Sequence, residues 1–194
     1  MQIFYFLENY MNNSKLCCPP WLNKEFRKLW VQHIYRTRFF IISTASDLPD
    51  LPYVTKWVLE NPGDFACVLK EFYGEERANI FKQLLTEHLT IAADLVNAIK
   101  NNEKQKAELT RKKWYENAKE IACYLAKINP CWSREKWQRL MFDHLKMTEN
   151  EAKLRIAGKF PEDIAEFNCI EKEAMEMADY MTKGIIKQCR GCFS

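Results

Sequence analysis

The sequence predicts an all-α protein built as an up-and-down helical bundle, and three observations lead to this prediction. Apolar residues recur at helical spacing along nearly all of the 194 residues, and no segment of any length alternates apolar with polar residues as a strand does. Glycine occurs only five times, which disfavours folds that depend on tight turns or phosphate-binding loops. Hydrophobic residues make up 47% of the chain, which is enough to form the core of one domain.

A first long helix is expected over residues 24–47, and its apolar stripe includes His33. Two prolines in "DLPDLPY" interrupt this pattern, and two short helices are expected to follow. They are divided by "NPGD" at residues 61–64, where asparagine followed by proline is typical of a helix start. A second long helix is expected over residues 75–99, with His88 on its apolar stripe.

The second half of the chain shows the same helical pattern. A third long helix is expected over residues 107–128; "NPCWS" ends it, and the next helix carries His144. "TENE" at residues 148–151 has the form of a capping box, which predicts that a further short helix begins there. The last long helix is expected over residues 161–188. These elements predict four long helices with short connecting helices.

The bundle is expected to be a single domain over residues 24–189, between tails at residues 1–23 and 190–194. Within it, "WVQHI" and "WYENA" are each followed by "NP" and then by "EHL" or "DHL". This shared order suggests two related helical hairpins packed about a pseudo-twofold axis. The corresponding residues are His33 with Asn117, Glu87 with Asp143, and His88 with His144.

The three histidines are the main candidates for a functional site, because each lies on a helical face that is otherwise apolar. Imidazole binds zinc and iron, so histidines from three helices can form one face of a coordination sphere. Glu171 is the best candidate for a fourth ligand, because an unpaired carboxylate on an apolar stripe is costly unless it binds a metal. The predicted metal ligands are therefore His33, His88, His144 and Glu171, and the predicted ion is Zn or Fe. A small polar ligand bound in the bundle core by the same histidines and carboxylates is the other expectation.

Four other polar residues are expected to support this site: Glu87, Asn117, Asp143 and Arg36. Glu87 and Asp143 each precede a candidate ligand directly, and Asn117 is the counterpart of His33 in the suggested repeat. Arg36 lies near the helical face of His33, where it either extends toward solvent or binds a small anion through two guanidinium nitrogens.

A second interpretation stays open, because the spacing of the candidate ligands is not that of a known bundle metal site. The Glu-x-x-His spacing of di-iron bundles is absent, and no histidine is followed four residues later by histidine or a carboxylate. An interior histidine is also satisfied by a neighbouring carbonyl and a hydroxyl group. The alternative is a non-catalytic structural or interaction protein whose polar core residues fix the register of the helices. The chain has no recognisable catalytic motif.

The charge balance excludes several classes of partner. A net charge of +3 with 28% charged residues is ordinary for a soluble protein and does not indicate nucleic-acid or membrane binding. No apolar run approaches the roughly 20 residues that cross a bilayer. The N-terminal "MQIFYFLENYM" lacks the basic residues of a signal peptide and carries Glu8, so a cytoplasmic location is expected.

The chain has eight cysteines, which are expected to be free thiols in a reducing compartment. Cys67, Cys123 and Cys169 lie within helical patterns and are expected to be buried as small hydrophobic residues. "CC" at residues 17–18 and "CRGC" at residues 189–192 lie near the two termini, and a zinc site is an alternative if the termini meet.

Several segments carry a resemblance to a known family: "LWVQHIY", "TRFFIISTA", "ANIFKQLLTEHLTIAADLVNA", "KKWYENA", "INPCWS", "DHLKMTENEA" and "MADYMTKGIIKQ". Over roughly residues 24–189 the chain resembles short helical proteins of unassigned function from Gram-positive spore-forming bacteria. Arg36 and the extra cysteines depart from the pattern of that family. The resemblance implies the helical fold and no particular activity.

Some members of that family carry the label acetylglutamate kinase. Such a kinase has an α/β fold with glycine-rich turns that hold phosphates. This chain has neither a strand pattern, a glycine cluster nor a Walker-type lysine loop, so its residues do not support the label.

Overall fold

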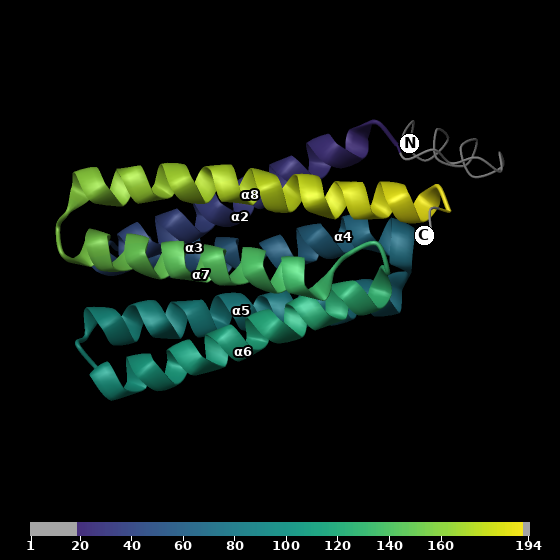
Figure 1. Cartoon of the computed structure of the whole chain (residues 1–194). Coiled ribbons are helices and arrows are strands. Elements are labelled where there is room, and N and C mark those ends of the chain that lie inside the picture. The colour runs from purple at the N-terminus through teal and green to yellow at the C-terminus, as the bar shows by residue number, and fades with distance from the viewer. Residues whose placement is uncertain (1–18, 192–194) are drawn as a thin grey trace.

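The computed structural model describes residues 19–191, and within this range the chain is almost entirely helical and contains no strand (Figure 1). The all-α bundle predicted from the sequence is therefore confirmed. No helix in the described range is long and apolar enough to cross a membrane. The helices are α2 (Trp21–Ala45), α3 (Leu51–Val58), α4 (Asn61–Tyr73), α5 (Glu75–Lys100), α6 (Lys104–Ile128), α7 (Arg134–Ile156) and α8 (Phe160–Cys189).

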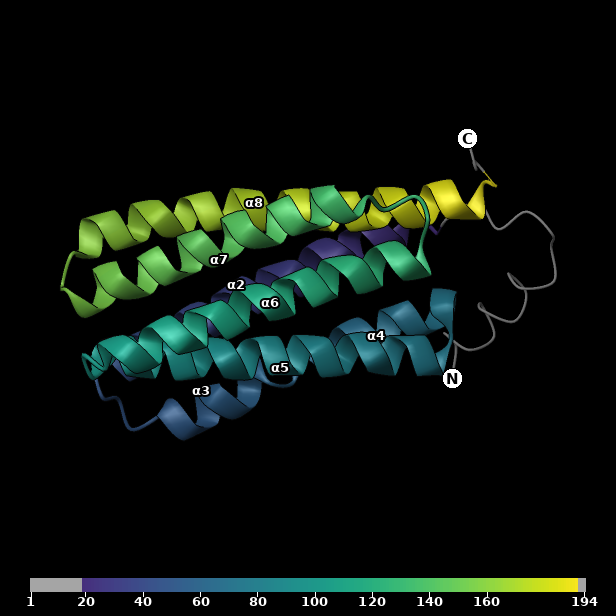
Figure 2. The ribbon, with the colours of Figure 1, turned by 60° about the horizontal axis from the view of Figure 1, so that its bottom comes forward.

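The long helices form two shells around the bundle axis. Helices α2, α5 and α7 contact one another and run in the same direction, as the colours in Figures 1 and 2 show. Helices α4, α6 and α8 run in the opposite direction, and each packs against two of these three inner helices. The short α3 packs on the outside of α2. The chain thus forms three antiparallel pairs in succession: α2 with α4, α5 with α6, and α7 with α8.

This arrangement reveals a threefold repeat in the sequence. The inner helices carry "FRKLWVQHI" (26–34), "FKQLLTEHL" (81–89) and "WQRLMFDHL" (137–145), which share an aromatic first residue, a leucine and a histidine at equal positions. The outer helices carry "NPGDFACVL" (61–69), "NAKEIACYL" (117–125) and "EAMEMADYM" (173–181). The suggestion of two related hairpins therefore gives way to three, and its pairing of His33 with Asn117 does not hold, because His33 is equivalent to His88 and His144.

Aromatic side chains fill the core around these repeats. Trp30 of α2 meets Phe65 of α4 edge-on, with ring centroids 5.3 Å apart, and Phe65 in turn contacts Phe81 of α5. At one end of the bundle, Trp132 and Trp137 pack edge to face. Burying side chains of this size contributes about 1.5–3 kcal/mol each, so the core holds the inner helices rigidly in place.

Two boundaries differ from those expected. Helix α7 continues without a break through the expected capping box, and Thr148 is buried in its interior, because His144, Thr148 and Ala152 follow one another on the same inward face. As a result, five described helices rather than four exceed 20 residues. The first described helix begins at Trp21, three residues before the expected helix start, and α8 ends at Cys189, one residue after its expected end.

Candidate functional site

The structure brings the three histidines together between the inner helices. His33 and His88 are 2% exposed and His144 is 3% exposed. The ring centroids of His33 and His144 are 5.7 Å apart, and a positive charge on either ring lowers the pKa of His88. We call these three side chains the histidine cluster.

Each histidine of the cluster uses its Nδ1 atom to contact the outer helix of its own repeat. His33 Nδ1 lies 2.9 Å from Asn61 Oδ1, and His88 Nδ1 lies 2.9 Å from Asn117 Oδ1. His144 Nδ1 lies 2.9 Å from Glu173 Oε2. These contacts obey the threefold repeat, since Asn61, Asn117 and Glu173 occupy equivalent positions.

The asparagine contacts determine which nitrogen of the imidazole carries the proton. Asn61 Nδ2 donates to the backbone carbonyl oxygen of Leu29, at 3.2 Å, so its Oδ1 atom faces His33 and accepts. In the same way, Asn117 Nδ2 donates to the carbonyl oxygen of Leu84, at 3.1 Å. An ionised carboxylate can only accept, so Glu173 plays the same role for His144. All three imidazoles therefore carry hydrogen on Nδ1.

The Nε2 atoms of the cluster are consequently free to act as donors of electron pairs. Nε2 lies on nearly the opposite side of the ring from Nδ1, so each Nε2 points away from the outer helix and toward the bundle interior. Within residues 19–191, no group hydrogen-bonds to Nε2 of His33, His88 or His144.

Burial keeps two of these imidazoles neutral. Desolvation lowers the pKa of His33 from 6.5 to about 3, and the nearby His144 adds to this effect. Desolvation also lowers the pKa of His88 to about 3, with smaller contributions from His33 and His144. At neutral pH both rings are therefore in the uncharged form, which is the form that binds a metal.

Two tryptophans form the walls of the cluster. Trp30 meets His33 and His144 edge-on, with ring centroids 5.5 and 6.4 Å apart respectively. Trp114 lies against His88, with centroids 5.3 Å apart. The indole N–H groups of both tryptophans are buried without a hydrogen-bond partner.

Glu171, the predicted fourth ligand, lies outside the cluster. Its Oε1 atom accepts a hydrogen bond from the Tyr35 hydroxyl, at 3.3 Å, near the surface. The inward face of α8 instead contains Ile170, Ala174 and Met177, which puts Glu173 on the cluster side. Most of the apolar stripe expected for this helix is buried, but the carboxylate that meets a histidine is Glu173 rather than Glu171.

The predicted supporting residues divide into two groups. Asn117 is buried and contacts His88 as described, whereas Glu87 and Asp143 are exposed. Adjacent residues on a helix point about 100° apart, so a residue next to an inward histidine can lie on the outward face, as Glu87 and Asp143 do. Arg36 is buried, but its Nη1 atom binds Asp64 at 3.1 Å and the Trp57 carbonyl oxygen at 3.3 Å, so an internal ion pair takes the place of the suggested anion.

A second buried polar network lies further along the inner helices. Arg38 Nη1 of α2 donates to Glu151 of α7 at 2.6 Å and to Asp163 of α8 at 2.8 Å. Burial raises the pKa of Glu151 to about 7, while Arg38 opposes this shift. The positive charge of one arginine is thus shared by two buried carboxylates.

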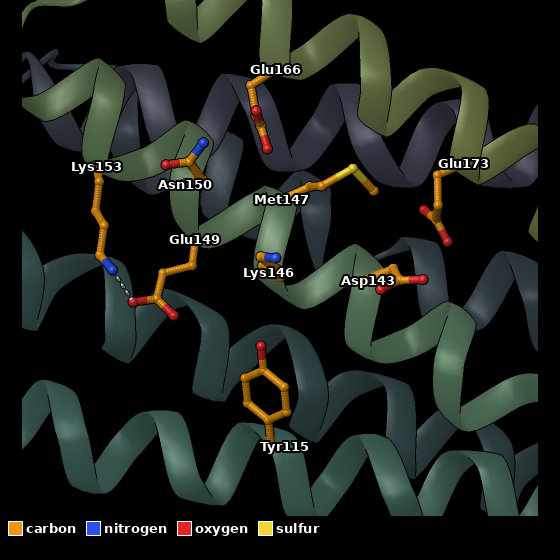
Figure 3. Close-up of a pocket in the computed structure, with 9 residues that line it drawn as sticks. All are labelled: Tyr115, Asp143, Lys146, Met147, Glu149, Asn150, Lys153, Glu166 and Glu173. Carbon is orange, nitrogen blue, oxygen red and sulfur yellow. Dashed lines mark ion pairs between the residues drawn. The ribbon is translucent and has the colours of Figure 1, made fainter. Parts of the chain in front are cut away.

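A surface cleft of about 700 Å³ lies beside the cluster, between α6, α7 and α8 (Figure 3). Its lining residues are Tyr115, Asp143, Lys146, Met147, Glu149, Asn150, Lys153, Glu166 and Glu173. Glu149 is already bound by Arg111 and Lys153. Glu173 takes part in both features, since it lines the cleft and contacts His144.

The side chains of the histidine cluster do not have the spacing of an assembled metal centre, and neither does any other metal-ligating group in the described range. Within residues 19–191, no group of three or more His, Cys, Asp or Glu side chains has the spacing of an assembled metal centre. Cys67, Cys123 and Cys169 are exposed, in contrast to the burial expected from their helical pattern. Cys17, Cys18 and Cys192 lie outside the described residues, so the alternative of a zinc site at the termini is untested.

Three comparisons with known proteins were made for this chain. Neither family models, nor curated proteins, nor solved structures match this chain.

Proposed function

We propose that the protein binds a divalent transition-metal ion, Zn²⁺ or Fe²⁺, through the Nε2 atoms of His33, His88 and His144. The observation that carries this proposal is the common hydrogen-bond pattern of the three rings, which places hydrogen on Nδ1 and leaves each Nε2 without a partner. Metal-ligating histidines almost always donate their other ring N–H to a carbonyl or carboxylate, which orients the ring. Here all three rings have such a partner.

The spacing of the rings supports an ion between His33 and His144. Two imidazoles that bind one ion at about 2.1 Å through Nε2 in tetrahedral geometry have centroids about 5 to 5.5 Å apart. The observed separation of 5.7 Å is slightly larger, so modest side-chain rotations complete the site when the ion binds. The proposal requires the His88 ring of α5 to approach the same ion, so that the bound ion links all three inner helices.

Metal analysis of variants at His88 tests this proposal. Wild-type protein loaded with Zn²⁺ and desalted is expected to retain one ion per chain, and His88→Gln and His88→Ala are expected to lose it. Glu87→Gln is the matched control, because Glu87 is the exposed neighbour of His88 on the same helix. Circular dichroism verifies that each variant is folded. Equal zinc content in wild type and in the folded His88 variants contradicts the proposal, as does a wild type that retains no ion.

A second function is supported by the same hydrogen bonds. Asn61 and Asn117 each join an outer helix to both a histidine and a backbone carbonyl of an inner helix. In a structural or interaction protein that binds no metal, these bonds would fix the register of the helix pairs. The spacing of the three histidines, which is not that of an assembled metal centre, favours this function. In that case the His88 variants lose stability, and the wild type has no zinc affinity.

A further inference from the structure

The third repeat differs from the other two at the position that contacts the histidine. Asn61 and Asn117 present a neutral amide to their histidines, whereas the equivalent residue of the third repeat is Glu173. An amide oxygen is sufficient to orient an imidazole, as the first two repeats demonstrate. The negative charge of Glu173 therefore needs a separate reason.

Glu173 is a costly residue at this place in the core. Its side chain is 10% exposed, and its Oε1 atom is buried without a hydrogen-bond partner. The other carboxylate oxygen accepts the hydrogen bond from His144. A buried carboxylate with one oxygen unsatisfied is unfavourable unless a positive charge lies close by.

Within residues 19–191, the side chain paired with Glu173 is His144, one of the proposed ligands, and Lys146, which lines the same cleft, forms no ion pair with Glu173. Arg36 is bound to Asp64. Arg38 is shared between Glu151 and Asp163. In the adjacent cleft, Lys153 binds Glu149, and Figure 3 shows Glu173 beside another acid, Asp143, at the opposite end of the cleft from Lys153.

We infer that Glu173 compensates the charge of the bound ion and makes the histidine cluster selective for divalent over monovalent cations. This inference rests on the proposed function. Because Glu173 contacts Nδ1, it lies on the far side of the His144 ring from the ion and acts through that ring rather than as a ligand. One negative charge beside three neutral imidazoles leaves a 2+ ion with a net charge of only +1.

The electrostatic part of this effect depends on the charge of the ion. Coulombic attraction is proportional to the product of the two charges, so removal of the carboxylate costs a 2+ ion about twice the free energy that it costs a 1+ ion. A residue that only orients His144 affects both ions equally. The ratio of the two affinities therefore separates charge compensation from orientation of the ring.

Competition titrations with Zn²⁺ and, under anaerobic conditions, Cu⁺ test the inference on the full chain. Glu173→Gln is expected to weaken Zn²⁺ binding about 10- to 100-fold, in the range found for outer partners of metal-binding histidines. Cu⁺ binding is expected to weaken only about 3- to 10-fold. The loss of binding free energy for a 1+ ion is half that for a 2+ ion, so its fold-loss of affinity is the square root of the fold-loss for Zn²⁺. Glu173→Asn, which copies the side chain of the other two repeats, serves as a second variant in case the first does not fold.

Glu171→Gln is the matched control, since it removes a carboxylate from the same helix two residues away, where Glu171 faces Tyr35. Its affinities for both ions are expected to equal those of the wild type. Equal losses of Zn²⁺ and Cu⁺ binding in the Glu173 variants, or no loss of either, overturn the inference while the proposed function stands. A wild type that binds neither ion overturns the proposed function itself.

Discussion

Replacement of Asn117 by alanine should strongly destabilise the metal-free protein. Asn117 is 3% exposed and makes two hydrogen bonds, from His88 Nδ1 at 2.9 Å and to the carbonyl oxygen of Leu84 at 3.1 Å. The loss of two hydrogen bonds costs about 1 kcal/mol each, and a buried ring N–H without an acceptor adds about 1–3 kcal/mol. The free energy of unfolding should therefore fall by about 3–5 kcal/mol, a large share of the stability of a domain.

Urea denaturation of the metal-free protein, followed by far-ultraviolet circular dichroism, measures this change. Glu116→Ala is the control, because Glu116 is the exposed neighbour of Asn117 and pairs only with Lys119 at the surface. It should change the free energy of unfolding by less than about 0.5 kcal/mol. Surface substitutions change the free energy of unfolding by at most about 0.5 kcal/mol. If Asn117→Ala changes it by no more than this, the assignment of Asn117 as the anchor of His88 is refuted.

Three further predictions concern packing and pH. Gly184→Ala should destabilise the protein by about 1–3 kcal/mol or more, because a Cβ atom there would lie 1.8 Å from the Trp132 indole nitrogen; thermal unfolding measures this. Because the pKa values of His33 and His88 are lowered to about 3, the unfolded chain binds more protons, and stability in urea should fall as the pH drops from 6.5 toward 3. Because the pKa of Glu151 is raised to about 7, its contribution to stability is present below about pH 4.5 and is lost as the pH rises through 7. Glu151→Gln lacks this contribution, so it should lose more stability than the wild type as the pH is lowered from 7 to 4.5.

Each of these predictions has a result that contradicts it. A melting temperature of Gly184→Ala equal to that of the wild type would mean that the Trp132 ring moves aside without cost. A stability that is constant between pH 6.5 and 3 in the wild type would mean that the buried rings are protonated as easily as in the unfolded chain. Parallel pH profiles of Glu151→Gln and the wild type would remove Glu151 as a titrating group.

The fold class and the inward direction of the histidines were predictable from the sequence, because both depend on helical periodicity. A residue at every third or fourth position returns to the same face of a helix, so an apolar stripe that includes His33 or His88 already places these rings inside. The same argument failed for Thr148, where a local capping pattern suggested a helix start. In the folded protein the inward face of α7 continues through this position, and packing outweighs the weaker local preference.

The partners of the histidines were decided only by the tertiary structure. Periodicity assigns a face to each helix, but it does not say which neighbour that face meets or how far each helix is rotated about its axis. Periodicity therefore left two nearby carboxylates on α8 unresolved: Glu171 contacts Tyr35 near the surface, whereas Glu173 contacts His144. The role of Asn61 was not predicted, because an asparagine before a proline indicates a helix start. Its contact with His33 joins two separate helices, and periodicity does not predict such contacts.

The sequence by itself determined that this chain is helical and that three imidazoles lie on buried faces, because those properties arise from the order of residues along single helices. The tertiary structure decided that the imidazoles meet, that each is oriented by an outer helix, and that one partner is charged. These properties depend on the packing of three hairpins around a common axis, and contacts between segments far apart in the chain leave only a faint trace in local sequence.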